Sequence, residues 1–384
     1  MYKKILIFLP NTFSQRDYER FGIKYLKKNF LVKILDFTAW LYPNYWKECY
    51  DKVYKCEEYK SIQSKQDFLE FINDEDSVIV LDDLEKNVKT NWIRKQLKKK
   101  KTLFVGLDLN LIPIPKKNFL TKLNYLILRP KVFFYVVIKY FFKYFKFDKV
   151  YQPQVSIISG KESFLQSRAK DKIYAHSMDY DIYLNLKKRS INKEPYAVFL
   201  DEDMANHPDY LLLNFKKPVE ESKYFETLVK FFKKFESETK FKVKISVHPR
   251  SRTKHLEKYL KDFELYKGNT AELVKDSSMV LLHSSTSISY AILFEKSIIF
   301  LTSDELKKSW IGSRIFNFSK VINSKLINMS DLNYNFDVKN LFNFDQNKYQ
   351  EYKDQYLKYP NSPDIPLWEI FTKNIIKNYN NKTT

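Results

Sequence analysis

The stretch YAVFLDED, residues 196–203, places three acids directly after a short apolar run. The apolar residues are 197–200, and Asp201, Glu202 and Asp203 follow without a gap. A short apolar run bounded by polar residues is typical of a strand buried on both faces of a parallel sheet. We therefore predict a buried strand whose carboxyl end carries three carboxylates.

Similar apolar runs recur along the chain and alternate with amphipathic, helix-like stretches. In the second half, strands are predicted at 197–200, 243–247, 263–266, 279–282 and 297–301, and helices at 220–237 and 286–294. In the first half, strands are predicted at 4–9, 31–37, 77–81, 102–105, 155–159 and 172–176, and helices at 16–28 and 89–98. This alternation indicates an α/β protein whose sheets are parallel and covered by helices.

The length and the polar stretches suggest where the domains lie. With 384 residues, the chain is long enough for two domains. The sequence turns polar and charged at 185–195, so we expect a first domain at 1–190 and a second at 191–325. The tail, 326–384, is rich in Asn, Lys and Tyr and is predicted to form loops and one helix near 367–377 that packs back across the first domain.

The chain is strongly basic, with 67 Lys and Arg residues against 46 Asp and Glu and a formal net charge of +21. Such a surface attracts nucleic acid, anionic bilayers and phosphorylated small molecules. Nucleic acid is the weakest of these expectations, because no zinc-finger spacing, aromatic RNA-binding pattern or basic helix-turn-helix is present. Cys49 and Cys56 have no zinc-site spacing, and the apolar start ends early at Pro10, so we expect a cytoplasmic protein with free thiols.

The segment 116–149 is both basic and aromatic. Its longest uncharged apolar run, 132–138, is far shorter than the roughly 20 residues of a membrane span. Lys139, Lys143 and Lys146 share one face of a helical pattern whose other faces are aromatic. Such a helix can lie in the headgroup layer of an anionic membrane, or it can pack on the domain with its lysines in solvent.

Two more predicted strands end in residues that bind anions. His248, Pro249 and Arg250 follow the strand 243–247, and the run His283, Ser284, Ser285, Thr286 and Ser287 follows the strand 279–282. Ligands of open parallel sheets bind at the carboxyl ends of the strands. We therefore expect these two loops and the acidic run to share one site.

Each basic or hydroxyl group in these loops has a functional and a structural interpretation. The run 284–287 offers hydroxyls and backbone N–H groups to a phosphate or carboxylate where a helix begins, although an ordinary N-cap requires only one of them. His248 and Arg250 can donate charge-assisted hydrogen bonds to a phosphate, and His248 can protonate a leaving oxygen. A lone histidine is also often structural.

The acids have the same two interpretations. Adjacent carboxylates repel one another, which favours a proton-accepting pKa suited to a general base in Asp201 or Glu202. A solvated acidic loop or a helix N-terminus is the alternative. Asp203, His207 and Asp209 are candidates for contacts with the substrate.

Together, the three stretches resemble bacterial sialyltransferase-like glycosyltransferases that transfer nonulosonic acids or Kdo to surface carbohydrate. Those families have an acidic pair followed by glycine, then an HP motif, then a Ser/Thr motif. Asp201-Glu202, His248-Pro249 and Ser285-Thr286 match them in the same order, within residues 150–305. Asp203 stands where the acidic motif has glycine. The resemblance implies a GT-B fold, in which two Rossmann-like domains face each other across a cleft.

The resemblance also implies an activity. A sugar acid (sialic, pseudaminic, legionaminic or Kdo-like) would pass with inversion from a CMP-activated donor to a surface glycan or glycolipid. Asp201, or second Glu202, would deprotonate the acceptor, and His248 would bind or protonate the CMP phosphate. Pro249, Arg250 and the run 283–287 would contact the donor, without a metal or cofactor. The enzyme would work at the inner face of an anionic membrane, with no nucleic-acid partner.

Other functions stay open on the sequence alone. A polyol-phosphate transferase that uses CDP-glycerol, and a transferase that uses a UDP-sugar or another NDP-sugar, would share the fold and several of the same loops. Outside the enzymes, the alternatives are a basic nucleic-acid-binding protein and a scaffold that binds lipid through the segment 116–149. Nucleotide binding separates the enzymes from both.

Overall fold

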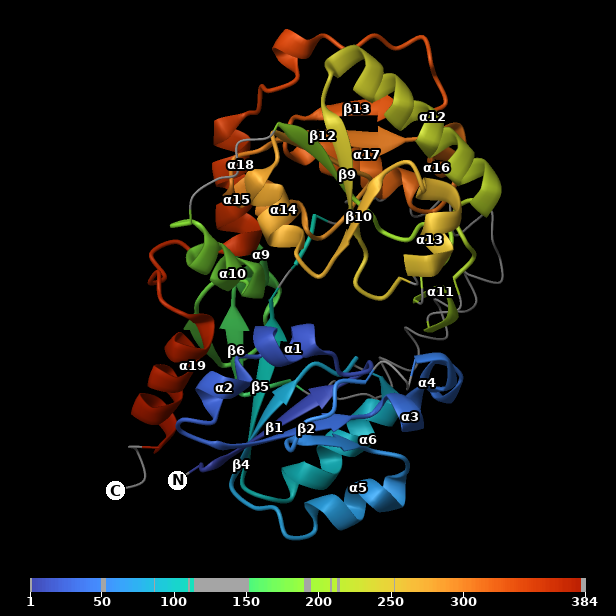
Figure 1. Cartoon of the computed structure of the whole chain (residues 1–384). Helices are drawn as coiled ribbons and strands as arrows, with labels where there is room; N and C mark the ends of the chain where they lie inside the picture. Colours follow the sequence, from blue (N-terminus) through green and yellow to red (C-terminus); the bar gives the residue numbers. More distant parts are fainter. Residues whose placement is uncertain are drawn as a thin grey trace, which may run out of the picture.

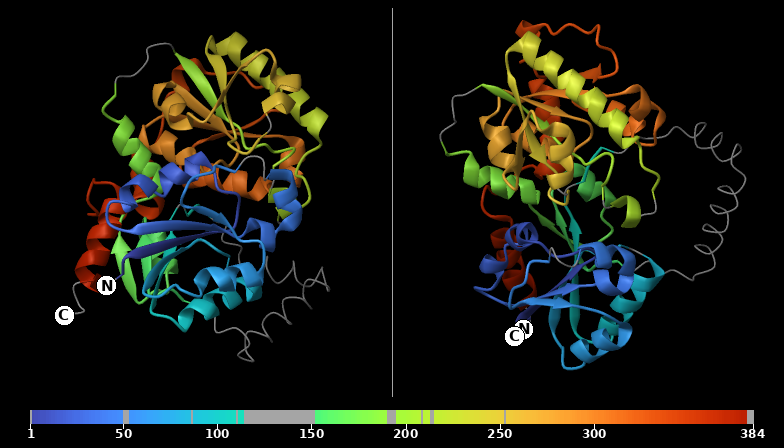
Figure 2. Two further views of the ribbon diagram at one scale, coloured as in Figure 1. Left: turned by 60° about the horizontal axis from the view of Figure 1, so that its bottom comes forward. Right: turned by 45° about the vertical axis from the view of Figure 1, so that its right-hand side comes forward.

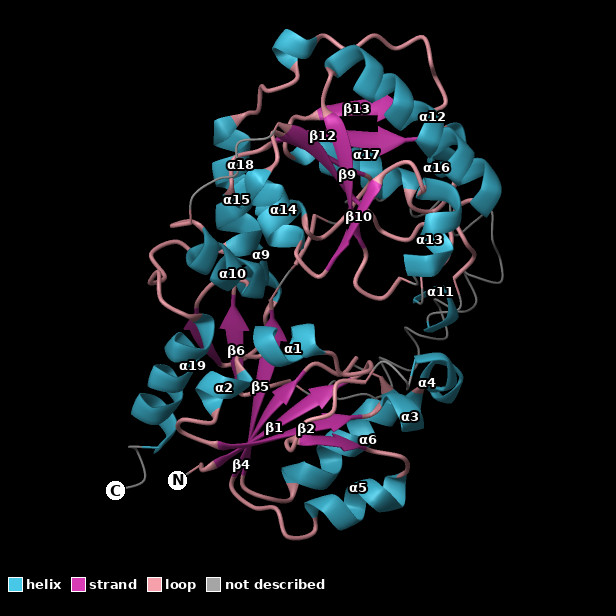
Figure 3. Ribbon diagram, in the orientation of Figure 1, coloured by secondary structure: helices cyan, strands magenta, loops and turns pink. Residues whose placement is uncertain are grey.

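The computed structural model describes residues 2–49, 53–85, 87–109, 111–113, 152–189, 195–207, 209–212, 215–251 and 253–380. They form two α/β domains, each built on one parallel sheet with helices packed on it (Figures 1 and 3). The α/β class predicted from the sequence is confirmed. The segment 116–149 lies outside the described residues, so its membrane role stays a prediction.

The first sheet has seven parallel strands in the order β3-β2-β1-β4-β5-β6-β7. Its strands are β1 (Lys4–Leu9), β2 (Leu31–Asp36), β3 (Tyr59–Ser61), β4 (Val78–Asp82), β5 (Thr102–Asp108), β6 (Val155–Ile158) and β7 (Asp171–Tyr174). The helices in this part of the sequence are α1 (Gln15–Arg20), α2 (Ile23–Leu26), α3 (Thr38–Leu41), α4 (Pro43–Cys49), α5 (Lys65–Ile72), α6 (Val88–Lys98), α9 (Lys161–Gln166) and α10 (Met178–Leu186). The strand order reverses between β1 and β4, and ligands of such sheets bind at this switch point.

The second sheet repeats this plan with six parallel strands in the order β10-β9-β8-β11-β12-β13. Its strands are β8 (Tyr196–Leu200), β9 (Lys242–Val247), β10 (Glu264–Lys267), β11 (Met279–Leu282), β12 (Ser297–Thr302) and β13 (Lys325–Asn328). The helices that follow β8 are α11 (Asp209–Leu212), α12 (Glu221–Thr239), α13 (Thr253–Leu260), α14 (Thr270–Asp276), α15 (Ile288–Leu293), α16 (Asp304–Lys308), α17 (Gly312–Val321), α18 (Gln346–Tyr352) and α19 (Leu367–Ile375). The switch point of this sheet lies between β8 and β11.

Burial explains why these runs form central strands. Every residue of β8, β11 and β12 is buried, as expected for strands with helices on both faces. Helix α12 buries a mostly aromatic stripe with helical spacing, made of Tyr224, Phe225, Phe231, Phe232 and Phe235 together with Leu228. The high aromatic content therefore fills the core of the second domain.

The helix predicted at 16–28 is wrong, because two short helices replace it. Gly22 separates α1 from α2 with a φ of +54°, a left-handed conformation that favours glycine. A Cβ atom at this position would lie 2.3 Å from Cδ1 of Trp368. The approach of the carboxyl-terminal helix α19 therefore determines the break, which explains why the local pattern did not reveal it.

Two helices cross from one domain to the other. Helix α10 packs on α14 and α15 of the second domain, whereas α19 packs on α2 and β7 of the first. The two chain ends lie side by side (Figure 2), and the N–H of Tyr2 donates to Oδ1 of Asn380 at 2.7 Å. Strand β13, which was predicted as part of an irregular tail, extends the second sheet instead. Among the described residues, no helix is long and apolar enough to span a membrane.

Candidate active site

The loops after β8, β9 and β11 meet at the carboxyl edge of the second sheet. Strand β8 lies between β9 and β11, so its acidic loop can reach both neighbours. Asp201 Oδ2 accepts the backbone N–H of His248 at 3.2 Å, and Glu202 Oε1 accepts the backbone N–H of Ser284 at 2.6 Å. The structure thus brings together the three stretches that the sequence singled out.

Asp201 is buried, and both of its carboxylate oxygens are occupied. Besides the bond to His248, Oδ1 accepts the N–H of Asp203 at 2.9 Å. Burial, reinforced by the charge of Asp203, raises the pKa of Asp201 to about 7, although both N–H groups oppose this shift. The side chain therefore holds two loops in place, and its role as the general base stays a prediction.

Glu202 ties the acidic loop to the hydroxyl-rich loop. Its Oε1 accepts the N–H groups of His283 and Ser284, and its Oε2 accepts the Ser284 hydroxyl at 3.1 Å. Burial raises the pKa of Glu202, whereas Arg314 and these hydrogen bonds oppose the increase. The Ser284 hydroxyl is buried and donates to Glu202, so a ligand would have to compete with this bond.

Asp203, which stands where the acidic motif of the resembling families has glycine, has a left-handed backbone conformation. Its φ is +49°, in the left-handed region that glycine adopts most easily and that Asp also tolerates. Its buried carboxylate accepts the Ser251 hydroxyl at 2.7 Å. The departure from the motif therefore keeps the shape of the turn and adds a bond to the β9 loop.

His283 lies in the core rather than at an open surface. Its Nδ1 donates to the carbonyl of Leu301 at 2.7 Å, and its Nε2 accepts the Tyr224 hydroxyl at 2.9 Å. Burial lowers the pKa of His283 to about 4, which keeps the ring neutral. Because both ring nitrogens are engaged, the geometry favours a structural role, and the predicted donor contact stays a prediction.

His207 and His248 form a pair that the sequence did not predict. Each Nδ1 accepts a backbone N–H two residues further on, from Asp209 at 3.1 Å and from Arg250 at 3.3 Å. A neutral ring whose Nδ1 accepts must carry its proton on Nε2. The two Nε2 atoms are only 3.4 Å apart. The two nitrogens are within hydrogen-bonding distance of each other, and one acceptor atom placed beside both of them would satisfy both N–H groups.

The surroundings of the pair keep both rings neutral. Burial lowers the pKa of His248 strongly, and the neighbouring His207 and Arg250 lower it further. Burial also lowers the pKa of His207, against the opposing charge of Asp209. Two neutral donors beside a cation fit an oxyanion such as a phosphate oxygen.

Arg250 connects this pair to the first domain. Its Nη1 donates to Asp209 Oδ1 at 2.8 Å, and its guanidinium also hydrogen-bonds the hydroxyl of Tyr45 on α4. Pro249 forms the exposed turn between His248 and Arg250. Asp209, predicted as a substrate contact, therefore orients Arg250.

The hydroxyl run lies beside this group but does not form the helix start that was predicted. Helix α15 begins at Ile288, and its N-cap Ser287 makes no side-chain capping bond. Ser285 Oγ accepts the N–H of Ser287 at 3.2 Å, and Thr286 is exposed. The hydroxyls of Thr286 and Ser287 accept or donate no hydrogen bond within the part of the chain that the structure describes.

Arg16 of the first domain is a functional candidate that sequence reasoning missed. It is exposed on α1, and no described residue forms an ion pair or hydrogen bond with its guanidinium. Its charge reaches His248, whose pKa it helps to lower. The surrounding protein and Arg20 lower the pKa of Arg16 itself. Nearby acidic groups oppose this shift, namely Asp179, Tyr290 and Asp17. A cation beside another cation at this position is a second element of the candidate anion site.

A buried clasp sets the position of α1 relative to the second domain. Asp179 of α10 pairs with Arg20 at 3.0 Å and accepts the hydroxyls of Ser289 and Tyr290 on α15 at 2.5 and 3.1 Å. Its carboxylate thus joins a helix of the first domain to a helix of the second. The clasp holds Arg16, four residues before Arg20, at the boundary between the domains.

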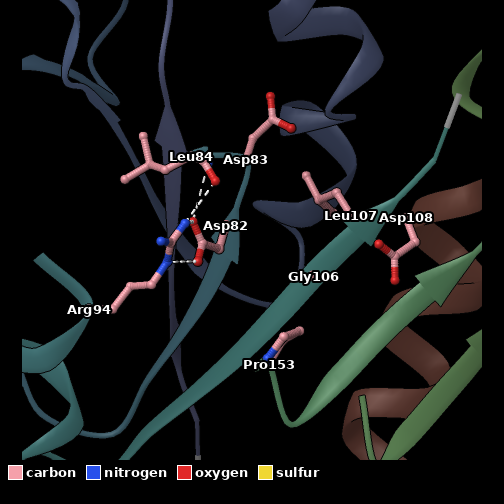
Figure 4. Close-up of a pocket in the computed structure, with 8 residues that line it drawn as sticks. All are labelled: Asp82, Asp83, Leu84, Arg94, Gly106, Leu107, Asp108 and Pro153. Carbon is pink, nitrogen blue, oxygen red and sulfur yellow. Dashed lines mark hydrogen bonds and ion pairs between the residues drawn. The ribbon is translucent and has the colours of Figure 1, made fainter. Parts of the chain in front are cut away.

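A second acidic run, Asp82-Asp83, ends β4 at the switch point of the first sheet. Asp82 pairs with the buried Arg94, whose Nε and Nη2 lie 2.6 and 3.0 Å from its oxygens (Figure 4). Asp83 extends away from that pair, and within the described ranges no hydrogen bond or ion pair reaches its carboxylate. The sequence signal was present, because the two acids directly follow the predicted strand 77–81.

The described residues contain no candidate metal site. Within the ranges that the structure describes, no three His, Cys, Asp or Glu side chains are grouped so that they could hold a metal ion. The groups available for a ligand's negative charge are cations and N–H donors. That a reaction here proceeds without metal stays a prediction.

Comparisons with known proteins give the fold. No family profile and no curated protein matches the sequence. A UDP co-structure of MnaA from S. aureus is 12% identical, with a TM-score of 0.50 and coverage of 99% of this chain and 97% of that one. The wall teichoic acid polymerase TagF is 11% identical, with a TM-score of 0.50 and coverage of 100% and 90%, and its H548A form gives 0.52 with 92% and 84%. The predicted GT-B fold of two Rossmann-like domains is confirmed.

Proposed function

We propose that this protein is an inverting glycosyltransferase that uses a nucleotide-activated donor. The observation that carries the proposal is the His207–His248 pair, whose two Nε2 atoms converge at 3.4 Å. A phosphate oxygen placed to one side, within hydrogen-bond distance of both nitrogens, would accept both N–H groups, and it would do so most strongly as charge develops on the leaving nucleotide. Arg16 and Arg250 supply the positive charge around it.

The donor that we propose is a CMP-activated sugar acid. The order of the acidic, HP and Ser/Thr motifs supports this choice, because it is the order found in the sialyltransferase-like enzymes. The donor phosphate would lie at the histidine pair, and the free hydroxyls of Thr286 and Ser287 would bind the phosphate or the sugar carboxylate. No metal is required in this scheme, since the cations and N–H groups take the negative charge.

Two other donors are supported by the structural likenesses. The co-structure of MnaA contains UDP, which makes a UDP-sugar the first alternative. TagF is a wall teichoic acid polymerase, and its likeness supports a polyol-phosphate donor such as CDP-glycerol. All three donors share a nucleotide phosphate, so the same histidine pair would serve each of them.

Calorimetric titration of the full chain with CMP, CDP and UDP, without added metal, tests the proposal. We expect CMP to bind, and His207→Ala and His248→Ala each to weaken binding about tenfold or more, since a hydrogen bond to a charged group contributes ~1.5–3 kcal/mol. His255→Ala is the matched control, because His255 on α13 bonds Glu221 and Asn206 outside the pair.

Each other outcome has a definite meaning. Preference for UDP or CDP would replace the CMP donor by one of the two alternatives. Binding that survives both histidine substitutions would remove the pair from the site, and no nucleotide binding by the wild type would contradict a glycosyltransferase of any of these classes.

We further propose that the acceptor is a glycan or glycolipid at the inner face of an anionic membrane. The net charge of +21 supports this location. Sedimentation with anionic vesicles at low salt tests it, and protein that stays in the supernatant would contradict it.

A further inference from the structure

A pocket opens in the first domain at the carboxyl ends of β4 and β5. It encloses about 140 Å³, and its walls include Asp83, Asp108, Gly106 and Pro153 (Figure 4). Sites for whole small molecules usually measure about 300–1,000 Å³. This pocket therefore fits one end of a ligand, such as a sugar hydroxyl and its neighbouring carbons, and is too small for a nucleotide sugar.

The two acids that end β4 are chemically different. Asp82 is neutralised by Arg94, which also donates to the carbonyl of Leu84 at 2.7 Å and thereby fixes the loop. Asp83 is exposed at the pocket, and no hydrogen bond or ion pair from the described residues engages its side chain. Asp108 across the pocket has no such side-chain partner among the described residues either.

A buried hydroxyl lies behind Gly106, one of the residues that line the pocket. Ser156 of β6 is fully buried, and its Oγ has no hydrogen-bond partner among the described residues. A Cβ atom on Gly106 would lie 2.8 Å from both this Oγ and Cγ of Pro153, which also lines the pocket. Glycine therefore keeps this wall of the pocket open.

Helix α1 links this pocket to the anion site. Arg16 acts electrostatically on His248, and Arg20 acts on Asp83. The two arginines are four residues apart on α1, which places their Cβ atoms on the same helix face, about 5–6 Å from each other. Helix α1 therefore carries one arginine whose charge acts on each of the two sites.

We propose that this pocket binds a hydroxyl of a neutral sugar or polyol acceptor, and that Asp83 is the general base that removes its proton. This inference rests on the proposed glycosyltransferase function. The acceptor oxygen attacks the anomeric carbon and forms the new C–O bond, while the bond to the phosphate oxygen breaks and its electron pair leaves with the nucleotide. The hydroxyl proton passes to the Asp83 carboxylate and then to solvent.

The protonation behaviour of Asp83 agrees with this role. Desolvation by the protein around the pocket raises the pKa of Asp83 to about 7, although the side chain itself still reaches solvent, and the charges of Asp82 and Asp17 add to the increase, whereas Arg20 opposes it. A base with such a pKa is half ionised near neutral pH and accepts protons well there. The carboxylates also disfavour acidic acceptors, which is why we expect a neutral one.

The test measures nucleotide affinity and transfer separately on the full chain. CMP titration reports the donor site, and release of CMP from CMP-N-acetylneuraminic acid with a panel of neutral methyl glycosides and glycerol reports transfer. We expect Asp83→Asn to keep its CMP affinity and to transfer about 10²–10⁴-fold more slowly than the wild type. The variant should also lack the rise in transfer rate that we expect for the wild type as the pH increases through about 7. Asp83→Glu should restore part of the rate.

Asp74→Asn is the matched control, because this exposed acid precedes the same strand at its amino end. It should leave both affinity and rate unchanged. If wild-type protein binds CMP but transfers to no neutral acceptor, or if Asp83→Asn transfers at the wild-type rate, the inference about Asp83 is overturned while the nucleotide site stands. If wild-type protein binds no nucleotide, the proposed function and this inference fall together.

Discussion

The two acidic runs, Asp201–Asp203 after β8 and Asp82-Asp83 after β4, occupy equivalent positions in the two sheets and are used in opposite ways. Each follows a buried central strand at the switch point of its sheet. In the second domain, each of the three carboxylates accepts at least one hydrogen bond from a neighbouring loop. In the first domain, Asp82 pairs with Arg94, and Asp83 is open to solvent.

The neighbours of an acidic run decide how its carboxylates are held. The loops after β9 and β11 direct backbone N–H groups at Asp201 and Glu202 and so fix the positions of both carboxylates. At β4, one guanidinium takes up the charge of Asp82 only. Asp201 and Asp83 both have a pKa raised to about 7, but Asp201 accepts hydrogen bonds through both oxygens, whereas no hydrogen bond from the described residues engages the carboxylate of Asp83.

The largest effect on the free energy of unfolding is expected from Asp82→Asn. This change leaves the charge of Arg94 buried without its ion-pair partner, which should lower the free energy of unfolding by about 3–5 kcal/mol. Urea denaturation followed by circular dichroism measures it. The control Asp67→Asn breaks the more exposed pair with Lys60 and should cost at most about 1 kcal/mol. Equal losses of unfolding free energy in both variants would show that the buried Asp82–Arg94 pair matters no more for stability than the exposed Asp67–Lys60 pair.

A smaller effect, which depends on pH, is expected from Asp201→Asn. The folded-state pKa of Asp201 is raised to about 7, so its contribution to stability is complete below about pH 4 and is lost as the pH rises through 7. The stability of the wild type relative to the variant should therefore fall by ~1.4 kcal/mol per pH unit within this window. Urea denaturation at pH 5, 6, 7 and 8 measures the slope. If the difference in unfolding free energy between wild type and variant is the same at every pH, burial does not raise the pKa of Asp201.

The smallest effect on stability is expected from Asp83→Asn. Its carboxylate holds no loop in place, so below about pH 4, where this carboxyl group is protonated in the folded and the unfolded state, the free energy of unfolding should change by no more than about 0.5 kcal/mol. The same denaturation experiment at about pH 4 checks this value. A loss of about 2 kcal/mol or more would mean that Asp83 supports its loop as Asp201 does, and the contrast between the two runs would disappear.

Much of the fold was predictable because it depends on local patterns. Short apolar runs and helical periodicity located the central strands β8, β9, β11 and β12 to within one residue, because strands covered on both faces must be apolar throughout. Elements with weaker patterns were missed. The three-residue edge strand β3 is half-buried, and β13 lies in a polar tail, so neither has a continuous apolar run.

By itself, the sequence determined that two parallel α/β sheets form and that polar loops gather at their carboxyl edges, because strand burial and strand direction follow from local hydrophobicity and connection length. Only the tertiary structure decided which of these polar groups stay available. Hydrogen bonding between loops far apart in the sequence engages Asp201, Glu202 and His283 and pairs His207 with His248. Such bonds depend on distances across the sheet, and a side chain's partners in space are not encoded in its neighbours along the chain.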